Sequence, residues 1–148
     1  QKVYRNTKQI LTYIRTLGYE VTIPEGIKEG DPVVEHHVKT VDEQLDLIAQ
    51  LVPTDSNQTL GIICPSTNYL QPFKTRFADD SHVRCLTFYE AQGVEFDTVA
   101  IVGWNKTFFS TEHIVAGARE EVERMQRDLF YVALTRAMER LIVLDRIS

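Results

Sequence analysis

Cysteine is scarce in this sequence of 148 residues, and long apolar runs are missing from it. The two cysteines, Cys64 and Cys85, each lie inside an apolar segment, which favours buried thiols over a disulfide framework. The four histidines show no metal-ligand spacing, so we expect no metal site. Neither a signal peptide nor a membrane-spanning run is visible, and we therefore expect a cytoplasmic protein without a membrane partner.

Basic residues are fewer than acidic ones in this sequence. The sequence has 16 basic and 21 acidic residues, a net charge of −5 and a pI near 5.4. Any contact with nucleic acid therefore has to use a local groove rather than a basic coat. The length suits one domain with its own core, so we expect a single domain over residues 1–148. The chain lacks an initiator methionine and enters a motif almost at once, from which we expect a fragment of a longer protein.

Helical and strand patterns alternate along the chain. Asn6 is the predicted cap of the first helix and Gly18 its stop, while Thr40 and Glu43 have the spacing of a capping box. Continuous apolar strands between amphipathic helices predict an α/β fold, in which helices cover both faces of a mostly parallel sheet. The predicted helices cover about residues 7–17, 41–52, 68–78 and 112–138, the last with a break near Gly117, and the predicted strands cover residues 33–38, 60–64, 83–87, 99–102 and 141–144.

Residues 128–137 read as a buried helix, because apolar side chains cover most of its circumference. Arg136 shares an apolar face of this helix. A guanidinium keeps its proton in a protein, so Arg136 has to meet an anion or lie at the rim of the core. Two interpretations follow: a structural ion pair with one of the acidic residues, or a functional contact with an anionic ligand.

Residues 87–99 lie between two predicted buried strands. We therefore expect them at the carboxyl end of a parallel strand, which is where ligands bind in open α/β sheets. Gly93 permits a tight turn, and Glu95 beside it offers a carboxylate that can accept hydrogen bonds from a ribose. The alternative is a plain connection in which Glu95 and Asp97 are solvated, and the spacing alone leaves both interpretations open.

Residues 3–7 place Tyr4 and Arg5 directly before the first helix. An aromatic ring and a guanidinium at a helix start can stack on a base and hold a phosphate, although most such pairs are ordinary surface residues.

In combination, these three segments resemble the second RecA-like domain of superfamily 1 helicases of the UvrD, PcrA and Rep kind. Residues 4–7 are similar to the family motif Asn-Tyr-Arg-Ser-Thr, and residues 87–95 to the motif Thr-x-His-x-x-Lys-Gly-Leu-Glu. Residues 130–137 are similar to the highly specific motif Tyr-Val-Ala-x-Thr-Arg-Ala. The resemblance spans essentially the whole chain and implies a three-layer RecA-like fold of the P-loop NTPase type.

The resemblance implies an ATP site that is shared with a second domain. Arg136 and Arg5 are expected to reach the γ-phosphate as arginine fingers, and Tyr4 to stack on the adenine. Glu95 is expected to bind the ribose hydroxyl, with Gly93 and Gln92 beside it. The chain has no Gly-x-x-x-x-Gly-Lys-Ser/Thr phosphate loop, so ATP and Mg²⁺ are expected to be held mainly by an N-terminal RecA-like domain outside it. We expect the isolated chain to be inactive.

The resemblance also implies a track for single-stranded DNA. Thr87 and Tyr89 are expected near the strand, where they would couple it to the nucleotide cleft. Thr67 and Asn68 weakly match another family segment that contacts DNA and are further candidates.

The sequence departs from the family pattern at several positions. Gln92 replaces a lysine, which removes a cation from the nucleotide cleft, while Tyr89 replaces a histidine, Val94 a leucine and Val3 an asparagine. Tyr89 and residues 95–97 look more like the helicase IV, or HelD, branch, whose members include RNA polymerase-associated ATPases. Three functions stay open: an ATP-driven motor on DNA, an ATPase that binds and remodels RNA polymerase, and a degenerate domain without turnover.

The interval between Arg5 and Thr87 is short, and the predicted helices and strands fill most of it. Since an independent domain needs a core of its own, we expect no accessory domain in this interval. We expect Arg5, Glu95 and Arg136 to converge along one edge of the sheet.

Overall fold

The computed structural model describes residues 5–55, 57–104 and 116–146 of the chain. Its helices and strands alternate, as the sequence predicts. In chain order they are α1 (Lys8–Thr16), β1 (Val34–Val38), α2 (Val41–Ala49), β2 (Leu60–Cys64), α3 (Thr67–Arg76), β3 (Val83–Thr87), β4 (Phe96–Trp104), α4 (Ala116–Thr135) and β5 (Ala137–Arg146).

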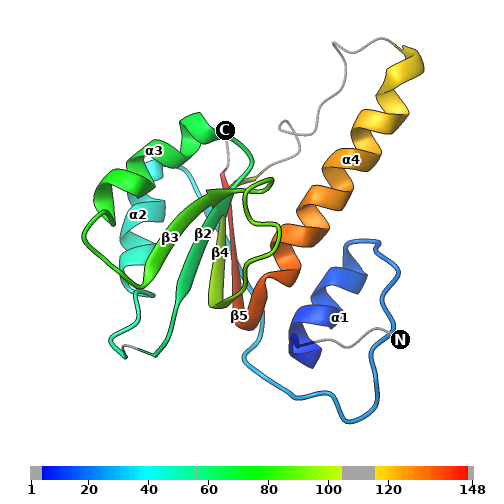
Figure 1. Cartoon of the computed structure of the whole chain (residues 1–148), viewed down its shortest axis with the longest axis horizontal. Coiled ribbons are helices and arrows are strands. Elements are labelled where there is room, and N and C mark those ends of the chain that lie inside the picture. Colours follow the sequence, from blue (N-terminus) through cyan, green and yellow to red (C-terminus); the bar gives the residue numbers. More distant parts are fainter. Residues whose placement is uncertain (1–4, 56, 105–115, 147–148) are drawn as a thin grey trace.

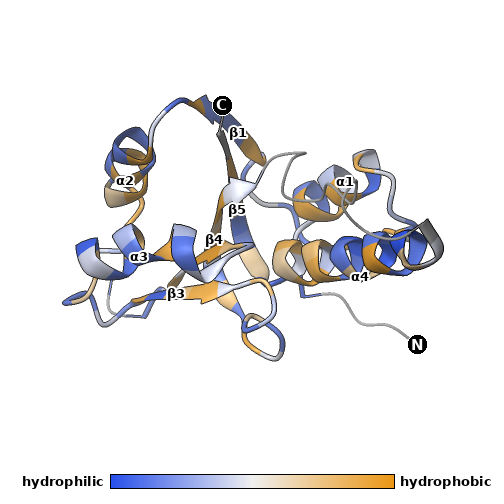
Figure 2. Ribbon diagram, turned by 90° about the horizontal axis from the view of Figure 1, so that it is seen from above, coloured by the Kyte–Doolittle hydropathy of each residue, from blue (hydrophilic) through white to orange (hydrophobic). Residues whose placement is uncertain are grey.

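The strands form one parallel sheet in the order β1-β5-β4-β2-β3, which places β4 at its centre. Helices α1 and α4 cover one face of the sheet, and α2 and α3 cover the other (Figures 1 and 2). The result is a three-layer α/β fold of the RecA-like type, and the predicted fold class is confirmed.

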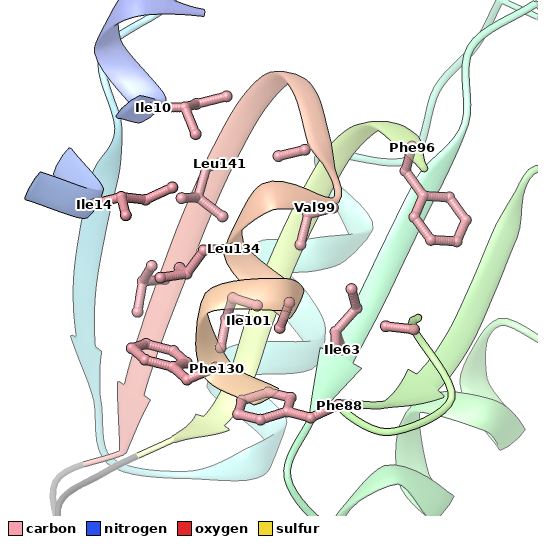
Figure 3. Packing of buried hydrophobic residues seen from close by; sticks show 14 of the residues in the cluster. Ile10, Ile14, Ile63, Phe88, Phe96, Val99, Ile101, Phe130, Leu134 and Leu141 are labelled. Carbon is pink, nitrogen blue, oxygen red and sulfur yellow. The ribbon is translucent and has the colours of Figure 1, made fainter. Parts of the chain in front are cut away.

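Side chains of the central strands alternate between the two faces, as successive residues of a strand must. Figure 3 shows Ile10 and Ile14 of α1 beside Leu141 of β5. The same buried cluster contains Leu134 of α4 and Val99 and Ile101 of β4. Because both faces of the central strands are buried, β2 and most of β4 read as apolar runs, whereas the edge strand β1 is exposed at four of its five residues. The residues facing α1 and α4 include Ile63, Ile101 and Val143, and those facing α2 and α3 include Ile62, Ala100 and Ile142.

Local signals placed most helix ends correctly. Thr40 caps α2 by accepting a hydrogen bond from the amide of Glu43, and Gly18 follows α1 with a φ of +100°, the left-handed conformation expected of a stop. The prediction that Asn6 caps α1 is wrong. Thr7 is the cap, its hydroxyl accepting from the amide of Ile10 at 3.2 Å, while the side chain of Asn6 is drawn into the core.

The prediction that the last helix continues through Met138 is also wrong. α4 ends at Thr135, and β5 begins at Ala137 after a single residue, Arg136. The helix stops because the amide of Phe96 takes the carbonyl of Arg136 into the ladder between β4 and β5, at 2.9 Å. Pairing with the neighbouring strand therefore overrides a helical pattern that the sequence alone would extend.

Strand β4 is longer than the predicted strand at residues 99–102 and runs from Phe96 to Trp104. Trp104 is half-buried and stacks on Phe130 of α4, with ring centroids 4.9 Å apart. The predicted helix start at Glu112 lies outside the described residues.

Both cysteines are free thiols. Burial raises the pKa of Cys64 in β2 to about 12 and that of the half-buried Cys85 in β3 to about 11. No helix in the described part of the chain has the length and apolar content needed to cross a membrane.

Candidate functional site

Two strands begin side by side at one edge of the sheet, and the residue before each carries candidate chemistry. Phe96 is the first residue of β4 and pairs with Ala137, the first residue of β5. Glu95 and Arg136 directly precede them. Both residues therefore lie at the amino-terminal edge of the sheet, and the expectation that residues 87–99 occupy a carboxyl end is wrong for Glu95.

The reason is the short connection between β3 and β4. Parallel strands require a crossover that returns the chain to the opposite edge of the sheet. Here the return is made by residues 88–95, which pass over the face covered by α1 and α4. Phe88 and Ala91 are buried in that layer, and Phe88 stacks on Phe130 with centroids 5.7 Å apart. Thr87 and Glu95 thus mark opposite edges of the sheet.

Arg5 reaches the amino-terminal edge from the segment before α1. Its Nη1 atom lies 2.5 Å from Oε1 of Glu95, and the two side chains are 70% and 34% exposed. An ion pair this open to solvent contributes about 0–1 kcal/mol to stability, so it does little to hold the fold together.

Arg136 is half-buried at the same edge, and its guanidinium is held by neutral oxygen atoms. Nε donates to the carbonyl of Val132 at 2.9 Å, Nη1 to the carbonyl of Val94 at 3.3 Å, and Nη2 to the hydroxyl of Thr135 at 3.1 Å. Within residues 5–55, 57–104 and 116–146, Arg136 forms no ion pair with a carboxylate. The alternative of a structural ion pair therefore finds no support in this part of the chain.

The donor set fits an anionic ligand. A guanidinium has five N–H donors, and one hydrogen bond at each nitrogen of Arg136 leaves two donors for a phosphate oxygen. Arg136 contacts Val94, and Arg5 contacts the adjacent Glu95. Arg5, Glu95 and Arg136 therefore converge at one edge, as expected, while their roles stay predictions.

Asn6 belongs to this site as well, although sequence reasoning assigned it only a capping role. Its side chain is 4% exposed, and Nδ2 donates to the carbonyls of Thr135 at 2.9 Å and Ala137 at 2.7 Å. Both acceptors lie about 130 positions away in the chain, so no local pattern predicts these hydrogen bonds. The one signal in the sequence was the position of Asn6 next to the tyrosine–arginine pair.

The other predicted nucleotide contacts lie on or before this edge. Gln92 and Gly93 are exposed on the connection that leads to Glu95, and Gly93 has a φ of +86° with open space around its Cα. That conformation favours glycine and leaves room for a ligand to approach the backbone. Tyr4 lies outside the described residues.

The DNA-binding candidates gather at the opposite, carboxyl edge of the sheet. Thr87 ends β3 and pairs with Cys64 at the end of β2. Tyr89, on the turn after Thr87, is 74% exposed. Thr67 and Asn68 are exposed in the first turn of α3, which follows β2 directly. The structure therefore separates the predicted residues into a nucleotide group and a DNA group at two edges.

Thr87 has a structural role that the sequence reasoning missed. Its hydroxyl accepts from the amide of Glu90 at 3.2 Å, and its amide donates to Oε1 of Glu90 at 2.9 Å. This is a capping box, and the Thr-x-x-Glu spacing was the signal for it. The backbone hydrogen bond from Thr87 lowers the pKa of the Glu90 carboxyl below its ordinary value.

A cavity of about 510 Å³ opens beside Arg5. Its walls carry matched charges, since Lys28 pairs with Glu139 at 2.9 Å. The cavity is therefore no independent anion site. Among the residues that the structure describes, no group of three or more His, Cys, Asp or Glu side chains is placed to hold a metal ion. The cavity lining comprises Arg5, Gly26, Ile27, Lys28, Asp97, Met138 and Glu139.

Comparison with known proteins gives a family match and a structural match. Residues 1–145 match the family model of the UvrD-like helicase C-terminal domain. The fold is similar to the crystal structure of the C-terminal domain of a possible DNA helicase from Lactobacillus plantarum WCFS1, with a TM-score of 0.63 and 19% sequence identity over 98% of this chain and 88% of that one. At this identity the likeness shows the fold alone. Among curated proteins, none matches the chain in sequence.

Proposed function

This chain belongs to the family of UvrD-like helicase C-terminal domains, and we propose that it supplies one wall of the ATP site in an ATP-dependent DNA helicase or translocase. A partner domain that carries a phosphate loop supplies the other wall, and holds ATP and Mg²⁺. The observation that carries the proposal is the meeting of Arg5, Glu95 and Arg136 at one edge of the sheet.

Each of these side chains suits a different part of the nucleotide. Bound ATP supplies the γ-phosphoryl group whose transfer to water drives the motor. Arg136 directs two N–H donors toward the charge that develops during this transfer, and its remaining bonds keep the guanidinium from turning away. Arg5 adds a second, more exposed cation. Glu95 accepts hydrogen bonds from the ribose hydroxyls once Arg5 releases it.

Single-stranded DNA is the proposed ligand of the carboxyl edge. Tyr89 is the most exposed of the large hydrophobic side chains in the described residues, and an aromatic ring of this kind stacks on bases regardless of their sequence. Thr67 and Asn68, exposed in the first turn of α3, are the proposed contacts for the phosphates of the strand. The connection of residues 88–95 links the two edges, so that a change at the nucleotide site is passed to the DNA track.

The alternative function, an ATPase that remodels RNA polymerase, rests on Tyr89 and residues 95–97. Two of these residues, Phe96 and Asp97, have structural roles in the fold. Asp97 accepts hydrogen bonds from the amide and the hydroxyl of Thr59, and the ring of Phe96 packs against Gly61. The pattern therefore serves the sheet and does not favour this alternative over the DNA motor.

Substitution of Arg136 tests the proposal in the protein that carries both domains. We expect Arg136→Ala to lower kcat for ATP by on the order of a thousandfold while changing the KM for ATP much less, because the contact acts in the transition state. Arg136→Lys should restore little, since a compact ammonium cannot reproduce the planar fork. Arg124→Ala, on an exposed part of α4, is the matched control. Normal turnover in a folded Arg136→Ala variant would reject the proposal.

A further inference from the structure

Asn6 connects the segment before α1 to the junction between α4 and β5. Its side-chain amide has two N–H donors, and both are used, one on the carbonyl of Thr135 and one on that of Ala137. These are the two residues that flank Arg136. With only 4% of its surface exposed, Asn6 exchanges neither bond readily for water.

The backbone around Arg136 is consequently held at three successive carbonyls. Asn6 takes the first and the third, and the amide of Phe96 takes that of Arg136 itself at 2.9 Å. Carbonyls at the end of a helix have no partner within the helix. Without Asn6, the carbonyls of Thr135 and Ala137 lose these partners at the place where the chain changes from helix to strand.

The same side chain ties the two proposed fingers together. Arg5 precedes Asn6 in the chain and pairs with Glu95. The residues on either side of Glu95 both contact Arg136. The carbonyl of Val94 accepts a hydrogen bond from the Arg136 guanidinium, and the amide of Phe96 donates one to the Arg136 carbonyl. Segments from three distant parts of the sequence thus form a closed ring of contacts, to which Asn6 contributes a buried side-chain amide.

We infer that Asn6 is a positioning residue for Arg136: it fixes the backbone on both sides of the finger and so fixes the direction of the guanidinium. The inference rests on the proposed function, because positioning matters for turnover only if Arg136 acts on ATP. A group held in its productive geometry before the reaction reacts faster than one that must be ordered during it. Holding both carbonyls takes two N–H donors, which the Asn6 amide supplies, whereas a serine hydroxyl offers one donor and a carboxylate none.

Hydrogen exchange of the arginine side chains tests the positioning in this chain. We expect Asn6→Ser to raise the exchange rate of the Arg136 Nε–H by on the order of tenfold, since local opening exposes that bond, and Asn6→Asp to raise it further. Arg15 is the control within the same molecule, because its Nε also donates to a backbone carbonyl, that of Val21, at 3.2 Å. Its exchange should not change.

Loss of stability is separated from loss of positioning by a second variant. Ile48 lies in α2 and packs in the core on the opposite face of the sheet from α4. Ile48→Val removes one buried methyl group there, away from Arg136. This variant should leave the Nε–H exchange of Arg136 unchanged. An equal rise in Ile48→Val and Asn6→Ser would overturn the inference, because it would reflect general loosening of the fold.

Turnover in the protein with both domains provides the functional measurement. We expect kcat to fall by roughly 10- to 100-fold in Asn6→Ser and further in Asn6→Asp, with the KM for ATP little changed. If Arg136→Ala abolishes turnover while Asn6→Ser alters neither exchange nor kcat, the inference is overturned and the proposed function stands. If Arg136→Ala leaves turnover intact, the proposed function fails, and the inference falls with it even where exchange responds.

Discussion

Arg5 and Glu95 lie 90 positions apart in the sequence and form an ion pair with an Nη1–Oε1 distance of 2.5 Å. The pair joins the tyrosine–arginine segment to the threonine–glycine–glutamate segment at the amino-terminal edge of the sheet. Because both side chains are open to solvent, the pair separates at little cost. This suits two groups that we propose to act on different parts of one nucleotide, Arg5 on phosphate and Glu95 on ribose.

The first prediction concerns this pair. Glu95→Gln should change the free energy of unfolding of the chain by less than about 1 kcal/mol, because exposed pairs are screened by water. A double-mutant cycle with Arg5→Ala, measured by urea denaturation, gives the coupling between the two side chains. In the protein with both domains, Glu95→Gln should raise the KM for ATP by roughly tenfold, since hydrogen bonds to a charged acceptor are the stronger ones. A coupling above about 2 kcal/mol would show that the pair is structural.

The second prediction concerns the packing beneath the site. A Cβ added at Gly61 in β2 would clash with the ring of Phe96, the buried residue that follows Glu95. Gly61→Ala should therefore destabilise the chain by about 1–3 kcal/mol, measured by thermal or urea unfolding. Gly117→Ala is the matched control: nothing lies within 4 Å of its added Cβ in α4, and it should stabilise the chain by about 0.5–1 kcal/mol. If both substitutions changed the free energy of unfolding in the same direction, the close packing of Gly61 against Phe96 would be contradicted.

The third prediction concerns pH. The pKa of Glu90 is lowered by its hydrogen bond from the Thr87 amide, so its carboxylate stabilises the fold above the ordinary value of 4.5 and loses this effect as the pH falls through the lowered pKa. Wild type should therefore be more stable than Glu90→Gln at pH 6, and the difference should shrink as the pH falls toward 3. Urea denaturation across this range measures it. A difference that grew on acidification would contradict the capping box.

The fourth prediction concerns the isolated chain. It should show no ATP hydrolysis, with or without single-stranded DNA, because it has no phosphate loop to hold the β-phosphate. Steady-state phosphate release from purified protein measures this, with Arg136→Ala as the control for contaminating ATPase. Turnover that tracks the protein and disappears in that variant would mean that the site is complete within these residues.

Elements that depend on local chemistry could be predicted from the sequence. Strands β2 and β3 have the predicted bounds, because short runs of apolar residues between turns leave few alternatives. The cap at Thr40 and the stop at Gly18 follow from side-chain and backbone preferences within a few residues. The family motifs likewise predicted that Arg5, Glu95 and Arg136 belong to one site.

The sequence by itself determined the alternation of helices and strands, the apolar runs of the central strands β2 and β4 and hence the three-layer parallel fold, since these follow from periodicity along the chain. Only the tertiary structure decided that Glu95 lies at the amino-terminal edge, that α4 ends at Thr135, and that Asn6 holds the backbone beside Arg136. Each of these depends on a hydrogen bond or strand pairing between residues about 40 to 130 positions apart. Such partners are determined by the packing of the whole sheet, because a buried donor or acceptor needs a hydrogen-bond partner and takes one that the fold brings close.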